Sequence, residues 1–291
     1  MASGITVGLE REGVADSGAI VVTHVASRFV GSIPEHYDRD LGPNIFHDYA
    51  EDLARRAAAS PVDSVLELAA GTGIVSRKLR DALAPKTRLV VTDLNPPMLE
   101  VAREKFPNDD EVELTPADAM GLPFADAEFD LIVCQFGVMF FPDKVASFRE
   151  AARVLRPGGR YIFNTWGAMA ANPFSQVAHE ATAAFFAADP PGFYLVPFSY
   201  PDPEGVKDDL AAAGWVDLEH ETIALRKTVA DLSGFARGIV YGNPLIEEIR
   251  QRGGVDPDDV MAAIVDGFRK RFGPEPFVMP LQATVFTARV P

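Results

Sequence analysis

Three acidic residues hold similar places along the chain, because each stands at or just beyond the end of a short apolar run: Glu67, Asp93 and Asp118. A carboxylate accepts hydrogen bonds from hydroxyl, amino and ammonium groups, so such residues suit a polar or positively charged ligand. If the three apolar runs are neighbouring parallel strands, their carboxyl ends meet at one edge of a sheet. The spacing therefore predicts a crevice where three acids converge on one ligand.

A turn of small residues, Ala69–Gly73, follows Glu67 and precedes a predicted helix. Small side chains there let a ligand lie directly on the backbone. A dinucleotide site would need a third glycine at Ser76, and its pyrophosphate would be repelled by Glu67. Asp93 would accept hydrogen bonds from ribose hydroxyls in a dinucleotide or in another adenosine ligand, so it does not choose between them. The acid before the turn favours a ligand that carries positive charge and no phosphate.

The same turn carries a resemblance to a known family. Residues 67–73 resemble motif I of the class I S-adenosylmethionine-dependent methyltransferases, E/D-x-G-x-G-x-G, with Ala69 in place of the first glycine. Residues 116–124 resemble the G-D-A-x-x-L-P-F segment of that family, with Ala117 in place of glycine. The resemblance covers roughly residues 37–166 and is to the small-molecule type, methyltransferase type 11, of ubiquinone and menaquinone biosynthesis.

The resemblance implies S-adenosyl-L-methionine as the cofactor and S-adenosyl-L-homocysteine as the product. It implies that Met98 lies against adenine, although a surface or core position for Met98 is an equal alternative. It also implies that Asp118 accepts a hydrogen bond from adenine, and that Gln135 lies under the methyl-donating sulfur. The implied cofactor-binding residues are Tyr37, Glu67, Ala69, Gly71, Thr72, Gly73, Asp93, Leu94, Met98, Asp118, Ala119, Met120, Gln135, Phe136 and Gly137.

Apolar runs near residues 65, 89, 112, 131 and 161 alternate with helical segments, which predicts an α/β fold with a parallel sheet. The resemblance extends this to a Rossmann-like, doubly wound and mostly parallel seven-stranded sheet with a terminal antiparallel strand pair. We expect the last strand to span Leu281 to Val290. The predicted parts are a loosely ordered arm (1–20), a helical lid (21–60), the cofactor domain (61–229 and 280–291) and a helical cap insertion over the acceptor site (230–279).

The composition limits the partners. The chain has 291 residues and a formal net charge of -15, which argues against nucleic acid or an anionic membrane as a partner. No apolar run reaches the roughly 20 residues that span a bilayer, and no signal peptide is evident. The single Cys134 excludes an internal disulfide framework and a cysteine-rich zinc site. We therefore expect a cytoplasmic protein without a metal, a monomer or homodimer, that acts on a small molecule.

Methyl transfer needs a general base only when the acceptor loses a proton in the same step. Among the five histidines, His24 and His36 are the candidates for catalysis, because both lie in the predicted lid. The acceptor side is suggested by aromatic residues that could equally pack the cap itself: Phe174, Phe185, Phe186, Phe193, Tyr194 and Phe198. The sequence thus favours a methyltransferase acting on an O, N or C atom of a small, hydrophobic or aromatic acceptor. The alternatives are a non-catalytic S-adenosylmethionine-binding protein and an NAD-type oxidoreductase.

Overall fold

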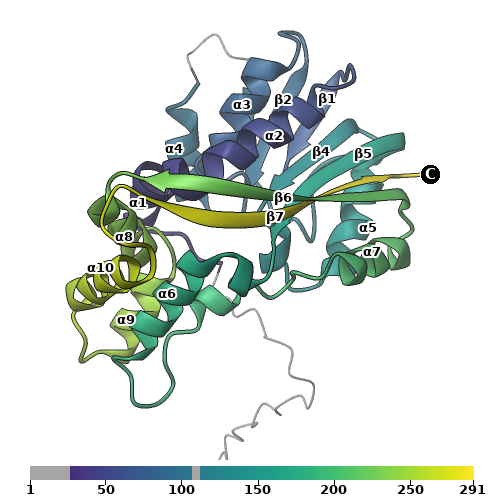
Figure 1. The fold of residues 1–291 in the computed structure, drawn as a ribbon. Helices are drawn as coiled ribbons and strands as arrows, with labels where there is room; N and C mark the ends of the chain where they lie inside the picture. The colour runs from purple at the N-terminus through teal and green to yellow at the C-terminus, as the bar shows by residue number, and fades with distance from the viewer. Residues whose placement is uncertain (1–26, 107–111) are drawn as a thin grey trace, which may run out of the picture.

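A seven-stranded sheet organises the residues that this computed structural model describes, 27–106 and 112–291. Its strands are β1 (Ser64–Glu67), β2 (Arg88–Asp93), β3 (Val112–Pro116), β4 (Phe129–Gln135), β5 (Leu155–Trp166), β6 (Val216–Val229) and β7 (Phe277–Arg289). They lie in the order β3-β2-β1-β4-β5-β7-β6 (Figure 1). The predicted N-terminal arm, residues 1–20, lies outside the described residues.

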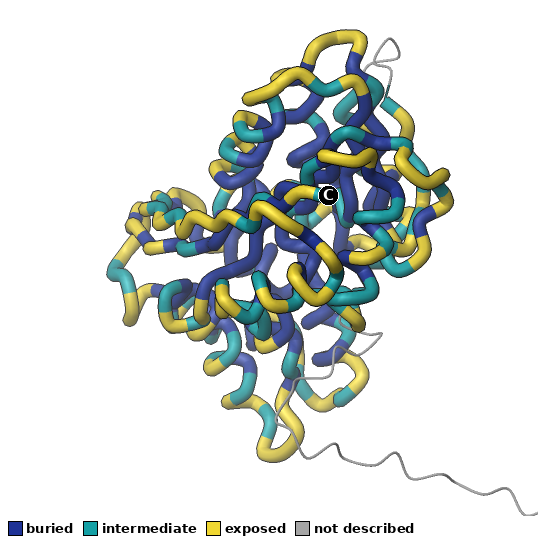
Figure 2. Tube along the Cα trace, turned by 90° about the vertical axis from the view of Figure 1, so that its right-hand side faces the viewer, coloured by how far each residue is buried: buried dark blue, intermediate teal, exposed yellow. Residues whose placement is uncertain are grey.

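Strands β1 to β5 pair with one another in parallel, whereas β7 is antiparallel to both β5 and β6. The central strands β1 and β4 are largely apolar and buried, as parallel strands covered by helices on both faces must be. Figure 2 shows that the buried residues gather in the middle of the molecule. The predicted Rossmann-like, mostly parallel sheet with a terminal antiparallel pair is confirmed. The last strand begins at Phe277 rather than at Leu281, because Phe277 still pairs with Val229 of β6.

Helices cover both faces of the sheet. They are α1 (Ile33–His36), α2 (His47–Ala57), α3 (Ile74–Ala82), α4 (Pro96–Arg103), α5 (Lys144–Val154), α6 (Pro173–Ala183), α7 (Pro203–Ala212), α8 (Leu232–Tyr241), α9 (Leu245–Arg252) and α10 (Pro257–Phe272). Apolar side chains of α2, α3 and α4 share one buried core, and those of α5 and α7 share another. A π-helical segment, Tyr37–Phe46 (η1), connects α1 to α2.

The helices α6, α8, α9 and α10 form a group beside the sheet, at the lower left of Figure 1. Helix α10 packs against both α6 and α8, and η1 contacts α8. Helix α6 lies in the stretch assigned to the cofactor domain, so the group is larger than the insertion predicted at 230–279. The segment η1 and helix α8, far apart in the sequence, thus pack against each other beside the sheet.

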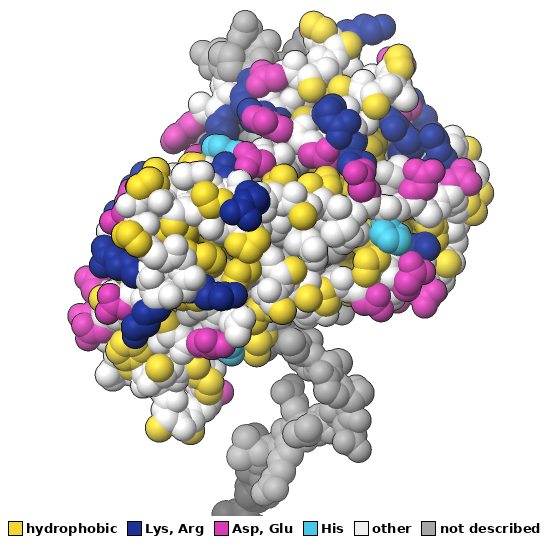
Figure 3. All heavy atoms as spheres, in the orientation of Figure 1, with side chains coloured by type: hydrophobic (Ala, Val, Ile, Leu, Met, Phe, Trp, Pro, Cys, Tyr) yellow, Lys and Arg dark blue, Asp and Glu magenta, His cyan; other side chains and the backbone are white. Residues whose placement is uncertain are grey.

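Acidic and basic side chains are interspersed on the face shown in Figure 3. The edge strand β6 contributes Glu221 and Lys227, which pair with Arg56 and Asp48 of α2 at 2.6 and 2.9 Å. Water and salt screen such exposed pairs, so each contributes little to stability. None of the helices in the two described ranges combines the length and the apolar composition needed to cross a membrane.

Gly73 fixes how closely the turn after β1 approaches α4. Its φ of 78° lies in the left-handed region that residues with side chains disfavour. A Cβ at this position would lie 2.8 Å from the Cβ of Ala102 in α4. Glycine is therefore required here both by the backbone conformation and by the helix packing.

Replacing Gly73 with alanine is expected to lower the free energy of unfolding by about 2 kcal/mol, because the new methyl group is strained and displaces α4. Chemical denaturation of the purified chain measures this change. Gly121→Ala is the matched control, since no heavy atom lies within 4 Å of a Cβ there. The control should change the free energy by less than about 0.5 kcal/mol. Equal losses in the two variants would contradict this account of Gly73.

Candidate functional site

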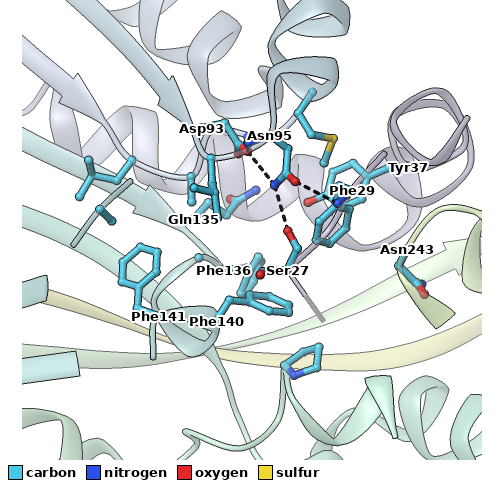
Figure 4. A pocket seen from close by; sticks show the side chains of 18 of the residues that line it. Ser27, Phe29, Tyr37, Asp93, Asn95, Gln135, Phe136, Phe140, Phe141 and Asn243 are labelled. Atoms are coloured by element: carbon cyan, nitrogen blue, oxygen red, sulfur yellow. Dashed lines mark hydrogen bonds between the residues drawn. The ribbon is translucent and has the colours of Figure 1, made fainter. Parts of the chain in front are cut away.

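A cavity lies at the carboxyl ends of β1, β2 and β4, and η1 covers part of it (Figure 4). Most of the predicted cofactor residues line this cavity: Tyr37, Ala69, Gly71, Asp93, Leu94, Met98, Asp118, Ala119, Gln135, Phe136 and Gly137. The strand order reverses between β1 and β4, and open α/β sheets form ligand crevices at that switch point. The topology therefore brings these residues together from segments that are far apart in the sequence.

Four of the predicted residues do not line the cavity: Glu67, Thr72, Gly73 and Met120. The Thr72 hydroxyl donates a hydrogen bond to Asp38 Oδ1 at 2.7 Å. The Met120 amide donates to Asp118 Oδ1 at 2.9 Å and so fixes that carboxylate at the cavity wall. These four residues do not reach the surface of the cavity. Of the three acids predicted to converge there, only Asp93 and Asp118 line it.

Asp93 holds together the segments around it. Its Oδ2 accepts a hydrogen bond from the Gly71 amide at 2.8 Å, and its Oδ1 accepts from the Asn95 amide at 2.8 Å (Figure 4). Burial raises the pKa of Asp93, and the hydrogen bonds from Asn95 and Gly71 oppose that shift. The carboxylate thereby fixes the glycine turn against the end of β2 while one side of it faces the cavity.

Glu67 is an acid of a different kind, because it is buried behind the cavity wall. Only 1% of the residue is exposed, and neither carboxylate oxygen has a hydrogen-bond partner among the described residues. Burial raises the pKa of Glu67 to about 8; the nearby Ser76 hydroxyl opposes the shift and the charge of Asp93 adds to it. Glu67 is thus largely neutral at pH 7 and would ionise readily beside a cation.

Replacing Glu67 with glutamine is expected to change how stability depends on pH. The pKa of Glu67 is raised in the folded chain, so burial favours the protonated form, and stability falls as pH rises from about 4.5 towards about 8. The glutamine variant lacks this loss, and above pH 8 it should be more stable than the wild type by at least about 1 kcal/mol. Urea denaturation across this pH range measures the difference. Parallel stability curves for the two proteins would contradict the raised pKa.

The segment η1 is attached to the glycine turn by Asp38. This carboxylate accepts hydrogen bonds from Thr72 and from Lys105 Nζ, each at 2.7 Å. The preceding residue, Tyr37, stacks on Phe46 with ring centroids 4.7 Å apart, and both rings line the cavity. Two rings from one helical segment therefore cover the part of the cavity next to the turn.

The prediction that His36 acts at the reacting atoms is not supported by its position. Its Nδ1 lies 3.1 Å from Asp40 Oδ2 and 2.9 Å from Arg39 Nη2, and its side chain does not line the cavity. Burial opposes ionisation of Asp40, but hydrogen bonds from Arg39, Arg237 and His36 outweigh it and hold the pKa of that carboxyl well below its usual range. His36 thus belongs to a cluster of charged side chains around Asp40, which forms where η1 packs on α8. His24 lies outside the described residues.

Aromatic side chains form the part of the cavity farther from the glycine turn. Phe136 and Trp166 stack with ring centroids 3.9 Å apart and an angle of 6° between the rings. The predicted residues that line this part are Phe174, Phe193, Tyr194 and Phe198. Phe185 and Phe186 do not line it, and Phe185 is 38% exposed. The aromatic wall thus draws on only some of the rings expected from the sequence.

Several residues of the cavity were not predicted from the sequence: Ser27, Phe29, Asn95, Phe140, Phe141, Trp166 and Asn243. Phe140 and Phe141 could have been predicted from the sequence, because they follow the end of β4 beside the switch point, where ligands usually bind. Asn243 could not have been predicted, because it reaches the cavity from the loop between α8 and α9, far from the motifs in the sequence (Figure 4).

Gln135 and Phe136 are held in an unusual turn at the end of β4. Phe136 has a φ of 51°, and its amide donates a hydrogen bond to Asn164 Oδ1 of β5 at 2.9 Å. Gln135 Nε2 lies 3.5 Å from the Phe46 carbonyl, whereas its buried Oε1 has no partner in the part of the chain that the structure describes. A strained residue and an unpaired buried acceptor at one turn are typical of a ligand-binding position.

Comparison with known proteins agrees with this geometry. A family described as Methyltransferase domain matches residues 66–163. The UbiE C-methyltransferase of ubiquinone/menaquinone biosynthesis from Hahella chejuensis is 39% identical over 102 residues, which cover 34% of this chain and 41% of that protein. The demethylmenaquinone methyltransferase of Clavibacter sepedonicus is 30% identical over 230 residues, which cover 73% of this chain and 89% of that protein.

The fold is shared with a solved methyltransferase. Phosphoethanolamine N-methyltransferase 2 of Haemonchus contortus, solved with S-adenosylhomocysteine, superposes with a TM-score of 0.57 at 16% identity. The match covers 89% of this chain and 57% of that one. The chain spans less than half the length of the Hahella relative but most of the Clavibacter relative. Together, the matched domain, the long Clavibacter alignment and the cavity at the switch point place this chain in the class I S-adenosylmethionine-dependent methyltransferase family of the UbiE type.

Proposed function

We propose that the chain transfers a methyl group from S-adenosylmethionine to an O, N or C atom of a small, apolar and aromatic acceptor. The observation that carries this proposal is one cavity with two unlike walls, an acidic one at the glycine turn and an aromatic one beyond it. The Clavibacter relative is named for a quinone, demethylmenaquinone, which agrees with an aromatic wall. The acceptor itself is part of the proposal.

The hydrogen-bond acceptors of the acidic wall match the donor groups of S-adenosylmethionine. A carboxylate has about four lone-pair sites, so Asp93 can accept from ribose hydroxyls while it retains its bonds to the backbone. Asp118 and the Ala119 amide offer one acceptor and one donor to adenine, and Leu94 and Met98 offer apolar contact. Glu67 lies behind the turn and would ionise beside a cationic amino-acid tail, which would give that tail a negative charge as its neighbour.

The chain's own task in this reaction is alignment and exclusion of water. S-adenosylmethionine, when bound, supplies a methyl group that its sulfonium already activates. The stacked rings of Tyr37 and Phe46 close the cavity on one side, and Trp166 on Phe136 forms a flat surface on another. Holding two reactants in such a space lowers the entropic part of the barrier. His36 takes no part in proton transfer, and a catalytic role for His24 remains a prediction.

Calorimetry with S-adenosylhomocysteine and with NAD tests the ligand class. We expect S-adenosylhomocysteine to bind with a dissociation constant in the micromolar range or below, and NAD to show no measurable heat. Turnover is then measured as release of S-adenosylhomocysteine across a panel of phenols, amines and reduced quinones. A chain that binds NAD alone would refute the proposal. A chain that binds S-adenosylhomocysteine but turns over no acceptor would support the non-catalytic binder instead.

Binding of S-adenosylhomocysteine should also release a proton from Glu67. The pKa of this residue is about 8 in the free chain, so the carboxyl is mostly protonated at pH 7, and the ammonium group of the ligand favours its ionised form. Titrations in buffers with different ionisation enthalpies should therefore report release approaching one proton. Glu67→Gln should release none and should bind about tenfold or more weakly, since the charge is lost. Equal proton release in both proteins would exclude Glu67 as its source.

A further inference from the structure

We propose that Glu248 of α9 is a positioning residue that sets the acceptor specificity of this site by holding its aromatic wall in place. The inference rests on the proposed function, because it concerns how the same cavity selects an acceptor. Glu248 does not line the cavity, so it acts only through the residues that do.

Glu248 binds the backbone of the wall directly. Its carboxylate is buried, and Oε2 accepts hydrogen bonds from the Gly192 amide at 2.7 Å and from the Phe193 amide at 3.2 Å. These two amides begin a short 3-10 turn, Phe193–Leu195, whose first donors have no partner within the turn itself. Hydrogen bonds to a charged acceptor are stronger than neutral ones. Glu248 therefore fixes the start of this turn from an element more than fifty residues away in sequence.

The turn that Glu248 holds carries two side chains of the aromatic wall. Phe193 stacks with Phe140 at a centroid distance of 6.3 Å, and Tyr194 meets Phe193 edge to face at 5.4 Å. All three belong to the acceptor part of the proposed site, and Phe193 and Tyr194 are buried. A shift of the turn would therefore move both rings and change the width of the space beside Phe140.

A second side chain, Asn243 in the loop before α9, holds the hydroxyl end of Tyr194 in the same wall. Asn243 Nδ2 donates to the Tyr194 hydroxyl at 3.1 Å and to the Ile239 carbonyl at 2.9 Å, and the Tyr194 hydroxyl donates to the same carbonyl at 3.2 Å. Asn243 Oδ1 accepts from the Leu245 amide at 3.0 Å. The polar atoms of Tyr194 and Asn243 are thus paired within the chain.

Paired polar groups do not require a hydrogen bond from the acceptor, whereas unpaired ones would penalise an apolar ligand. The wall can therefore accept a flat, uncharged ring on the basis of shape and apolar contact. Specificity then depends on where the rings stand, and Glu248 Oε2 is the buried acceptor that fixes the backbone beneath them.

Three variants of the full chain test this role. Glu248→Gln keeps an amide oxygen that can accept both backbone hydrogen bonds, Glu248→Met has similar length without an acceptor, and Glu248→Asp keeps the charge but cannot reach the turn. Naphthoquinone serves as the acceptor probe, because its oxidised form has no hydroxyl group and no electron-rich ring carbon that could take up a methyl group. Its binding is followed by quenching of tryptophan fluorescence in the presence of saturating S-adenosylhomocysteine; of the two tryptophans, Trp166 lines the cavity and Trp215 does not. Calorimetry gives the S-adenosylhomocysteine affinity of each variant.

We expect Glu248→Met and Glu248→Asp to weaken naphthoquinone binding about tenfold or more, and Glu248→Gln to stay within about threefold of the wild type. The S-adenosylhomocysteine affinity of all three should remain within about twofold of the wild type. Hydrogen exchange should increase at Gly192 and Phe193 in the Met and Asp variants only. With a turned-over acceptor, the Met and Asp variants should raise KM more than they lower kcat.

The outcomes separate this inference from the proposed function. The Asp variant keeps an acid at this site and serves as the test should the Met variant not fold. If its naphthoquinone affinity and hydrogen exchange equal those of the wild type, the positioning role alone is overturned. A wild-type chain that binds S-adenosylhomocysteine but not naphthoquinone would overturn the aromatic acceptor, and this inference with it. A wild-type chain that binds neither would overturn the proposed function as a whole.

Discussion

The hydrogen bond from the Gly71 amide to Asp93 is the contact on which the cavity depends. It joins the turn after β1 to the end of β2, and both segments line the cavity. The same carboxylate accepts from Asn95, whose side chain in turn donates to the Ser27 carbonyl at 3.0 Å and accepts from the Phe29 amide at 3.2 Å (Figure 4). One buried acid therefore fixes the glycine turn and, through Asn95, the N-terminal wall of the cavity.

The π-helical segment η1 is held at two points by two carboxylates. Asp38 pairs with Thr72 and Lys105 beside the glycine turn, whereas Asp40 receives two hydrogen bonds from Arg237 of α8. Residues two apart on a helix do not point to the same side, so the two carboxylates can reach different neighbours. The two ends of this segment, Tyr37 and Phe46, line the cavity. The cover of the site is thus attached both to the cofactor side and to the helical group on the acceptor side.

Glu67 and Asp40 show how the same chemical group takes opposite roles in one chain. Both carboxylates are buried, and burial alone raises the pKa of each. Asp40 meets the guanidinium groups of Arg39 and Arg237, which reverse the shift and make the group a permanent anion that holds two elements together. Glu67 has no such cationic neighbour among the described residues, and the nearby Ser76 hydroxyl does not outweigh burial. Its carboxyl therefore remains protonated near neutral pH and is available to a ligand with positive charge. The difference lies in the neighbours, which the residue type does not specify.

The sequence by itself determined the part of the site that depends on local backbone geometry. An acid at the end of an apolar strand, a turn that needs left-handed residues and a helix that packs closely behind it are all encoded by neighbouring residues, so the positions of Gly71, Asp93 and Asp118 could be predicted. Motif spacing likewise fixed the alternation of strands and helices, and hence the sheet and its switch point.

The tertiary structure alone decided which side chains meet across the fold. It placed His36 with Asp40 rather than in the cavity, left Phe185 exposed, and brought Asn243 and Glu248 to the acceptor wall. No periodicity in a single segment can encode these partners, because each contact joins elements that pack together only after the sheet has formed. The physical reason is that backbone conformation follows from nearby residues, whereas burial, pairing and the resulting charge of a side chain follow from neighbours that are distant in sequence.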